Sequence, residues 1–416
     1  MRSLIPSNDA FAVMRIKDFR GFLLARFLLN FSIQMQSVIV GWQVYQITGD
    51  VLQLGFIGLA EAIPFLGFAI ISGYVADRFN RRAIIIITNG IYLFCAILLL
   101  IFAWHFKILY PLFGIFPIYV IIFFTGVARS FFYPAQMAFM AQLVPKKLYP
   151  NSSTWNSAVW QISAVTGPAV GGLIYGFASV HAAYLTVVAG VAVALLFYTR
   201  VRSRPMPPVK KDESLVQSLS VGVRFVFSNQ VILGAMALDM FAVLFGGAVA
   251  VLPAFASEVL HIGPEGLGFL RAAPAIGAII MSVMLAYRPP LRHAGHNLLM
   301  GAAGFGVCII LFALSRNFYL SFVLLAFSGL FDNISVVIRS TIMQMLTPDA
   351  MRGRVAAVNS IFVGSSNEIG SFESGLAARL MGLITSVVFG GTMTLLIVAS
   401  TAKLAPKLRN LNLKLY

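Results

Sequence analysis

The chain has little charge for its length and almost no cysteine. Only 11% of its 416 residues are Asp, Glu, Lys or Arg, whereas 59% are hydrophobic and the mean hydropathy is +0.89. One soluble core cannot hold that much apolar surface, so the composition excludes the soluble class and predicts a polytopic membrane protein. The two cysteines, Cys95 and Cys308, lie inside apolar runs, and we expect packing residues rather than a disulfide or metal ligands.

Motifs for catalysis are also missing. No phosphate-binding loop, serine-nucleophile turn, His-Glu metal motif or pair of cysteine ligands occurs at a convincing spacing. The five histidines, all in or near predicted loops, are His105, His181, His261, His293 and His296. We therefore expect no enzyme, no cofactor and no metal; a membrane receptor or enzyme is the alternative from a different class.

What the sequence does contain is a succession of long apolar segments. A helix of about 20 apolar residues crosses the roughly 30 Å hydrocarbon layer of a bilayer. Short polar breaks separate the segments, so we predict an all-α fold with twelve transmembrane helices. The predicted spans are 20–47, 53–76, 83–104, 111–142, 153–177, 180–199, 229–254, 265–287, 296–314, 317–344, 355–378 and 383–402.

The two halves of the chain repeat one plan. The segment Leu54–Ile63 returns in altered form as Leu267–Ile276, 213 positions later, and Phe124–Gly126 returns as Phe327–Gly329, 203 positions later. A shorter loop in the second half accounts for the smaller offset. An internal repeat in an apolar chain is typical of transporters, in which two related bundles surround a site near a pseudo-twofold axis.

This repeat predicts the domain organisation. We expect a six-helix bundle over 1–199, a cytoplasmic linker over 200–228 and a second six-helix bundle over 229–416. The linker contains prolines and the charged cluster Lys210–Glu213. Apolar residues then recur at helical spacing over 215–226 beside Lys and Arg, which predicts an amphipathic helix on the cytoplasmic membrane face. A plain solvated connector is the alternative.

The net charge of +16 is distributed unevenly. Outside the spans, basic residues lie almost wholly in the terminal tails and in the loops from even to odd spans, while the opposite loops contain only Lys107, Arg316 and at most Arg379. This positive-inside bias predicts a cytoplasmic membrane protein with both termini in the cytoplasm, and nucleic acid is not an expected partner. Residues 1–20 lack the pattern of a signal peptide, so we expect the first span to direct insertion.

The loop after the second span contains a recognisable signature. It consists of Gly73, Asp77, Arg78, Arg81 and Arg82. This pattern resembles the conformational-switch loop of the major facilitator superfamily, except that Asn80 stands where the family has glycine. We expect Gly73 to allow close helix approach, Asp77 to bond to the N-terminal end of a neighbouring helix, and the arginines to hold the loop at the anionic inner leaflet. Topology-setting charges alone are the alternative.

The fifth span contains a second signature, formed by Gly167, Pro168, Gly171 and Gly172. It is similar to the glycine-proline motif of exporters in this superfamily that exchange substrate for protons, with Ser163 where the family often has another glycine. Small residues and a proline let helices pack closely and bend, and ordinary tight packing is the alternative. A wider likeness rests on the runs Gln34–Tyr45, Leu238–Gly247, Leu270–Pro274 and Asn367–Gly370. With these runs, nearly the whole chain resembles the branch of enterobactin exporters and secretion permeases, which implies a major facilitator fold.

Ionisable residues within the spans are functional candidates, because each costs about 2.5–3.5 kcal/mol on insertion scales. Offset 213 places Arg26 opposite Asp239 in the repeat, and offset 203 places Arg129 opposite Asp332. In the superfamily the helices that carry these four residues line the central cavity. We predict that the first half supplies cations and the second half carboxylates to a shared aqueous cleft, where pairing and hydration lower their burial cost. A structural lock between the halves is the alternative.

Proton coupling requires a carboxylate whose proton affinity changes between conformations, and Asp239 and Asp332 are the candidates. Other polar groups complete the predicted pathway. Glu61 and Arg271 are predicted to close the outer mouth. Gln34, Gln36 and Glu368 are predicted to reach the cavity, with hydrogen bonding between helices as the alternative. Arg339 and Glu373 are the remaining intramembrane charges.

The sequence as a whole favours a monomeric exporter of a small amphipathic organic compound. A siderophore is the first expected cargo and a range of drug-like compounds the second. We expect alternating access driven by proton exchange, with substrate, protons and membrane lipid as the partners. An uptake facilitator or symporter fits the same fold but leaves the glycine-proline motif unexplained.

Overall fold

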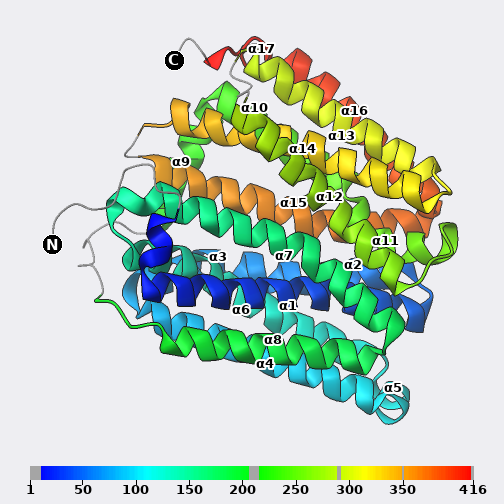
Figure 1. Cartoon of the computed structure of the whole chain (residues 1–416). Coiled ribbons are helices and arrows are strands. Elements are labelled where there is room, and N and C mark those ends of the chain that lie inside the picture. The colour runs from blue at the N-terminus through cyan, green and yellow to red at the C-terminus, as the bar shows by residue number, and fades with distance from the viewer. Residues whose placement is uncertain (1–10, 206–214, 288–291, 349–350, 414–416) are drawn as a thin grey trace. The chain divides into compact units, whose positions relative to one another are not determined.

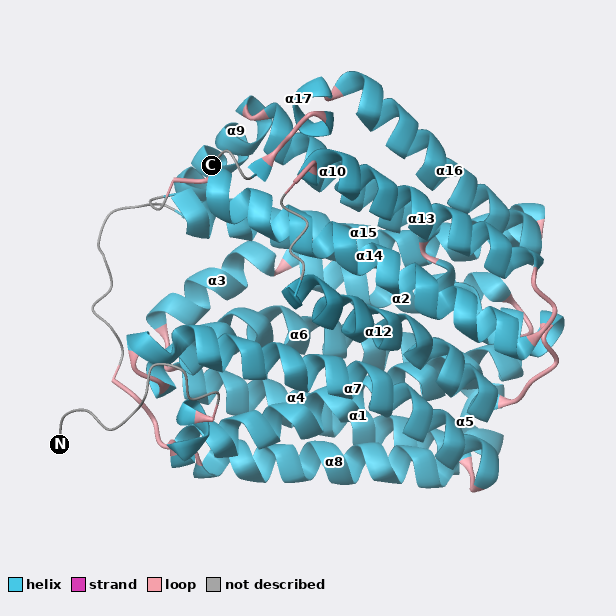
Figure 2. Ribbon diagram, turned by 45° about the horizontal axis from the view of Figure 1, so that its top comes forward, coloured by secondary structure: helices cyan, strands magenta, loops and turns pink. Residues whose placement is uncertain are grey.

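The structure is a computed structural model that describes residues 11–205, 215–287, 292–348 and 351–413. Within these ranges all regular structure is helical and no strand occurs (Figure 2). The predicted all-α class is therefore confirmed. The charged linker cluster Lys210–Glu213 lies outside the described residues.

The chain forms two compact units. Unit 1 comprises Met1–Ile39 and Ile63–Lys211, and unit 2 comprises Val40–Ala62 and Asp212–Tyr416. The end of α1 and the beginning of α2 therefore pack with the second half of the chain, and the boundary at 211 falls inside the predicted linker.

Unit 1 contains seven numbered helices in its described part. Helix α4 packs against α6 and α8, α3 packs against α6, and α7 packs against α8 (Figure 1). The helices are α1 (Lys17–Thr48, to residue 39), α3 (Ala69–Arg78), α4 (Arg81–Trp104), α5 (Phe106–Phe113), α6 (Phe116–Leu143), α7 (Tyr149–Phe177) and α8 (Val180–Arg200). Aromatic rings fill its interior. The ring of Phe22 lies 6.0 Å from those of Phe139 and Tyr198, measured between centroids, in edge-to-face contacts that join α1 to α6 and α8.

Unit 2 contains the remaining helices. Helix α14 packs against α12 and α13, and α10 packs against α15 and α16 (Figure 1). The helices are α2 (Val51–Gly67, to residue 62), α9 (Leu215–Ser228), α10 (Gln230–Gly246), α11 (Leu252–Ala254), α12 (Pro264–Tyr287), α13 (Ala294–Leu314), α14 (Phe318–Leu346), α15 (Arg352–Met381), α16 (Leu383–Leu404) and α17 (Pro406–Arg409). A π-helical turn over Phe255–Val259 follows α11. Helix α9 occupies the segment where an amphipathic helix is predicted, and its Val226 is buried in the core of unit 2.

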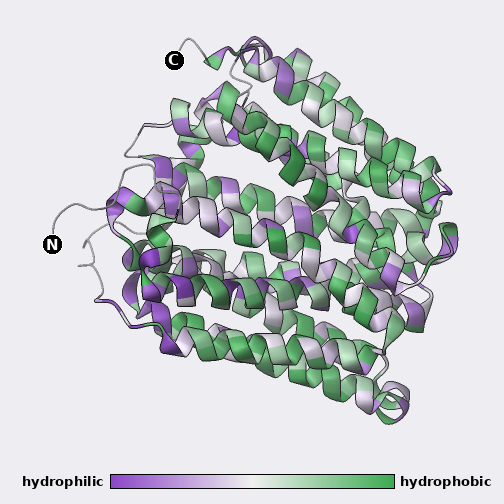
Figure 3. Cartoon of the chain, in the orientation of Figure 1, coloured by the Kyte–Doolittle hydropathy of each residue, from purple (hydrophilic) through white to green (hydrophobic). Residues whose placement is uncertain are grey.

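The helices coincide with the predicted spans. Within the described residues, nine helices are long and apolar enough to cross a membrane, and the bent pair α2 and α3 makes a tenth candidate. Helices α7 and α15 have 29 and 30 residues, long enough to cross, but they carry more polar side chains. Hydrophobic residues cover most of the helices in each unit, and hydrophilic residues gather mainly at helix ends (Figure 3). The arrangement is consistent with twelve crossings.

The duplicated plan appears in the helix boundaries. Helices α10, α12 and α13 begin 213 residues after α1, α2 and α4, respectively, and α15 and α16 begin 203 residues after α7 and α8. The offset shortens because α5 and its flanking residues separate α4 from α6, whereas only residues 315–317 separate α13 from α14. The predicted start of the fourth span at 111 is wrong, because Gly114 turns the chain with φ 58° and α6 begins at Phe116.

Candidate functional site

A buried ion pair joins two helices of unit 2. The carboxylate of Asp239 on α10 forms an ion pair with Nη1 of Arg339 on α14, and the two side chains are only 5% and 7% exposed. Apolar residues surround Asp239 on its own helix, including Met236, Leu238 and Ala242. Burying both charges is costly, and direct pairing offsets much of that cost. The sequence identified each residue as an intramembrane charge but did not predict that they pair with each other.

Asp332, the other candidate proton carrier, lies on the same helix as Arg339. Seven residues, about two helical turns or roughly 10 Å of rise, separate them on α14. Asp332 is half-buried, and the neighbouring Asn333 accepts a hydrogen bond from the Ser282 hydroxyl on α12 at 3.1 Å. Asp239 and Arg339 therefore join α10 to α14, and Asp332 lies on α14 beside the residue that bonds to α12.

The cations predicted for the first half both lie in unit 1. Arg26 on α1 is 4% exposed, and Arg129 on α6 is half-buried with its guanidinium 4.9 Å from the centre of the Phe65 ring. On α1, Gln34 is half-buried and Gln36 is buried. The shared cleft between the halves stays a prediction.

The switch-loop signature connects helices within unit 1. Arg81 donates from Nε to the Ala76 carbonyl at 3.1 Å and lies 3.8 Å from the Asp77 carboxylate. Arg82 donates to the Thr199 carbonyl of α8, and Arg78 lies 4.4 Å from the centre of the Tyr74 ring. These contacts tie the end of α3 and the start of α4 to the neighbouring helix α8.

Two positions of this loop bear on the family pattern. Among the described residues a Cβ at Gly73 would meet nothing within 4 Å, and close helix approach at Gly73 stays a prediction. Asn80, which replaces the family's glycine, is the N-cap of α4: its side-chain oxygen accepts from the Ala83 amide at 3.2 Å, with φ −59°. The turn therefore needs no glycine, and its hydrogen bond satisfies a free amide of the helix end.

The glycine-proline motif brings α7 against α1. A Cβ at Gly167 would lie 2.7 Å from the Gln34 Cβ and 2.8 Å from the Phe31 carbonyl oxygen, and one at Gly171 would lie 3.1 Å from the Met35 Cα. Glycine is required for this backbone approach. Ser163 fills the position of the family's additional glycine, and its hydroxyl contacts the Phe27 carbonyl oxygen at 3.4 Å. Pro168 and Gly172 are buried in the same helix.

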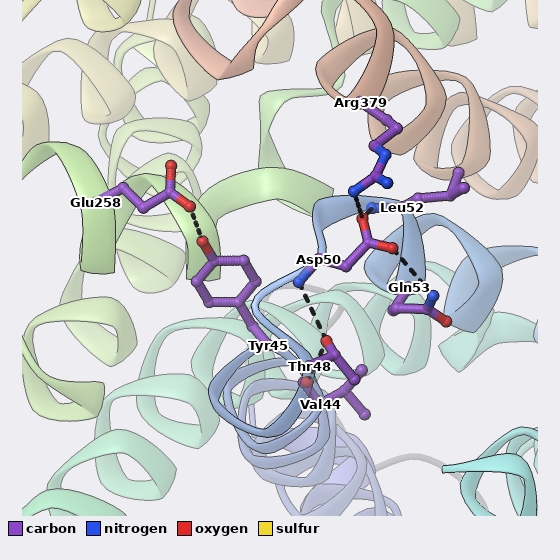
Figure 4. A network of polar contacts seen from close by, with 8 residues as sticks. All are labelled: Val44, Tyr45, Thr48, Asp50, Leu52, Gln53, Glu258 and Arg379. Carbon is purple, nitrogen blue, oxygen red and sulfur yellow. Dashed lines mark hydrogen bonds and ion pairs between the residues drawn. The ribbon is translucent and has the colours of Figure 1, made fainter. Parts of the chain in front are cut away.

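A polar network in unit 2 was missed by the sequence analysis. The hydroxyl of Tyr45 points to the carboxylate of Glu258 and donates a hydrogen bond to it (Figure 4). Asp50 accepts from the Leu52 amide and the Gln53 side chain, each at 3.1 Å, and from Arg379 at 3.2 Å. One signal was available, because residues 45 and 258 are separated by the repeat offset of 213.

The remaining predicted residues also lie in unit 2. Glu61 on α2 and Arg271 on α12 are half-buried, and Glu368 on α15 is buried. Helices α2 and α15 approach closely, since a Cβ at Gly58 would lie 3.3 Å from the Glu368 carbonyl oxygen. Among the described residues, no group of three His, Cys, Asp or Glu side chains is placed to hold a metal ion.

Comparison with known proteins identifies relatives across the whole length. The profile of the transmembrane secretion effector family, a major facilitator family, matches residues 8–414. The enterobactin exporter EntS of Shigella boydii serotype 18 is 26% identical over 380 residues, which cover 91% of this chain and 89% of that exporter.

Solved transporter structures share the fold. A POT family transporter in complex with 5-aminolevulinic acid aligns with a TM-score of 0.73 at 13% identity, over 94% of this chain and 96% of that one. The nucleoside transporter NupG aligns with a TM-score of 0.73 at 12% identity, over 93% and 99% of the two chains. At these identities the likeness shows the fold alone.

Proposed function

The chain belongs to the transmembrane secretion effector family of major facilitator transporters, and from this premise we propose that it exports a small amphipathic organic compound from the cytoplasm in exchange for protons. The enterobactin exporters among its relatives and the glycine-proline motif of α7 support export. A siderophore is the first proposed cargo, and drug-like compounds are the second. The protein works as a monomer by alternating access, with both termini in the cytoplasm.

The buried pair of Asp239 and Arg339 is the observation that carries proton coupling. Apolar residues of similar volume in place of a buried ion pair often leave stability unchanged or raise it, so packing alone gives no reason for charges here. Ionisable groups within membrane spans commonly belong to proton or substrate pathways. A carboxylate that meets its cationic partner across two helices is suited to couple protonation to helix movement.

Protonation of Asp239 would remove the negative charge that compensates Arg339. A buried guanidinium without a counter-charge is unfavourable, so the contact between α10 and α14 would rearrange. Asp332 lies on the same helix as Arg339 and is the second carboxylate of this coupling region. Protonation thereby weakens a contact that stabilises the present arrangement of unit 2. A proton that binds the two arrangements with different affinity can switch the protein between them.

Transport into inside-out membrane vesicles tests this proposal, with enterobactin as the probe. An antiporter should accumulate the probe when the lumen is acidified and lose that accumulation when a proton ionophore collapses the gradient. No accumulation beyond that of vesicles without the protein would overturn export of this cargo class. Accumulation that ignores the gradient would overturn proton exchange.

Asparagine variants locate the coupling residue. We expect Asp239→Asn or Asp332→Asn to retain downhill movement of the probe but to lose gradient-driven accumulation. Asp18→Asn is the matched control, because Asp18 pairs with Arg204 at 2.8 Å at the beginning of α1 in unit 1, whereas the proposed coupling residues belong to unit 2. Full coupling in both test variants would remove these carboxylates from the mechanism.

A further inference from the structure

The membrane-embedded part of unit 1 contains cations but no acid. The acidic residues of this unit are Asp9, Asp18 and Asp77. Asp18 pairs with Arg204, and Asp77 lies beside Arg81 at the end of α3. No carboxylate of unit 1 is therefore available within the spans to neutralise Arg26.

Arg26 is buried with unused hydrogen-bond donors. Arg26 is only 4% exposed, and its Nε and Nη1 atoms have no hydrogen-bond partner within the described part of the chain. A buried guanidinium in this state lacks both a counter-charge and acceptors, which is costly. An anionic oxygen at that place would supply both the counter-charge and the hydrogen-bond acceptors.

Other buried polar groups of unit 1 also have unused donors. Tyr198 and Tyr133 lie close enough to interact with it electrostatically, and the buried Tyr198 hydroxyl has no hydrogen-bond partner. The side-chain amide nitrogens of Asn30, one turn along α1, and of Gln136 on α6 are likewise buried without a partner. The two amide nitrogens can only donate, and the Tyr198 hydroxyl can donate or accept, so an anionic oxygen would satisfy several of these unpaired atoms.

The repeat gives an independent reason to place Gln136 beside Arg26. Offset 213 carries Asp239 onto Arg26, and offset 203 carries Arg339 onto Gln136. In unit 2 the equivalent residues form the buried ion pair of α10 and α14. Unit 1 therefore has the cation of such a pair on α1, but an amide occupies the position where the opposite charge would stand.

We infer that Arg26, with Tyr198 and Gln136, binds an anionic oxygen of the transported compound, either a carboxylate or an ionised phenol. This inference rests on the proposed export function and adds the charge of the cargo. The rings of Phe22 and Phe132 lie 6.0 and 6.2 Å from that of Tyr198, so the surroundings of the Tyr198 hydroxyl are aromatic. Tyr133 is 43% exposed and Asn30 is half-buried, so the region reaches the surface of the fold.

Binding of a matched pair of small aromatic probes tests the inference. Salicylate and salicylamide have nearly the same shape, but only salicylate carries a carboxylate. Their saturable binding to the purified full-length protein can be followed by the shift of its thermal unfolding midpoint. We expect salicylate to bind at least about tenfold more tightly than salicylamide, and Arg26→Gln to remove that preference, because a charge-assisted hydrogen bond is lost.

Two further variants separate binding from folding. Gln136→Glu should supply the missing counter-charge, so we expect it to raise the unfolding midpoint while it abolishes salicylate binding. Lys107→Gln removes an exposed cation of α5 and should change neither property. This combination of greater stability and lost binding is not expected of a residue that only packs.

The outcomes are distinct from those of the export assay. Equal binding of the two probes, no saturable binding of salicylate, or unchanged binding in Arg26→Gln would each overturn the anion site. A Gln136→Glu variant that binds normally and unfolds at lower temperature would show that Arg26 already has a carboxylate partner elsewhere in the chain. A protein that prefers salicylate but does not accumulate enterobactin would instead contradict the proposed cargo and leave the anion site in place.

Discussion

Replacement of Gly167 by alanine tests whether the motif of α7 is a contact that only glycine allows. The added Cβ would lie 2.7 Å from the Gln34 Cβ and 2.8 Å from the Phe31 carbonyl oxygen. Favourable carbon contacts lie at about 3.5–4.0 Å, so both distances are repulsive. Gln34 Cβ and the Phe31 oxygen are fixed to the backbone, and only displacement of α1 from α7 can relieve the clash.

The expected magnitude follows from two opposing contributions. Overpacking of this kind costs about 1–3 kcal/mol. Alanine in place of glycine stabilises a helix by up to about 1 kcal/mol. Because two close contacts must be relieved together, we expect a net loss of about 1–2 kcal/mol in the free energy of unfolding of Gly167→Ala. Transport per folded molecule should fall as well, since α1 carries Arg26.

Gly90→Ala is the matched control. Gly90 lies within α4 of the same unit, and a Cβ there would meet nothing within 4 Å. The same chemical change should therefore leave stability unchanged or raise it. Denaturation of both purified variants, followed by their intrinsic fluorescence, provides the comparison. If Gly167→Ala is as stable as Gly90→Ala, the packing argument for the motif is refuted.

Substitutions at three further sites have expected outcomes. Asp239→Asn should destabilise unit 2 by about 3–5 kcal/mol in denaturation measurements, because Arg339 stays buried without its counter-charge. The double variant Asp239→Leu with Arg339→Met should recover much of that stability without recovering proton-driven transport. A double variant no more stable than Asp239→Asn would argue against the pair. Arg379→Gln should lower the free energy of unfolding by at most about 0.5 kcal/mol, because the Arg379 side chain is 62% exposed and Asp50 keeps its other hydrogen bonds. A larger loss in the same measurement would show that the ion pair of Arg379 and Asp50 (Figure 4) stabilises the fold more than an exposed pair should. Asn80→Ala should lower the free energy of unfolding by about 1 kcal/mol through loss of the α4 cap, and Asn80→Gly by only a few tenths of a kcal/mol. A glycine variant that is less stable than the alanine variant in thermal unfolding would contradict the capping role.

Composition and periodicity predicted the spans well because burial in lipid requires long apolar helices whatever their neighbours are. They did not predict where helices break. The second predicted span is bent between α2 and α3, near Pro64, and the seventh changes to short 3-10 and π-helical turns after Gly246. Both breaks occur inside apolar sequence, where hydropathy carries no information about backbone geometry.

The candidate site could be predicted only one residue at a time. Burial cost marked Asp239 and Arg339 separately as unusual, but pairing depends on which helix faces meet. Gly73 is a second example, since a glycine in a sequence motif does not reveal whether another backbone approaches it. The repeat contained more information than single positions did, because a contact in one unit specifies the equivalent pair in the other.

The different chemistry of the two equivalent pairs has a consequence for the driving force. Unit 2 pairs Asp239 with Arg339, whereas the equivalent pair in unit 1, Arg26 and Gln136, has a net positive charge that we assign to an anionic cargo. Exchange of one proton for one monoanion moves two charges in the same electrical direction. At about 2.3 kcal/mol per charge for each 100 mV, the membrane potential would contribute about 4.6 kcal/mol per 100 mV to export. We therefore expect a lumen-positive potassium diffusion potential to accelerate uptake into inside-out vesicles at constant pH gradient, with vesicles lacking the protein as the control. A rate that does not respond to the potential would contradict either the negative charge of the cargo or its exchange for protons.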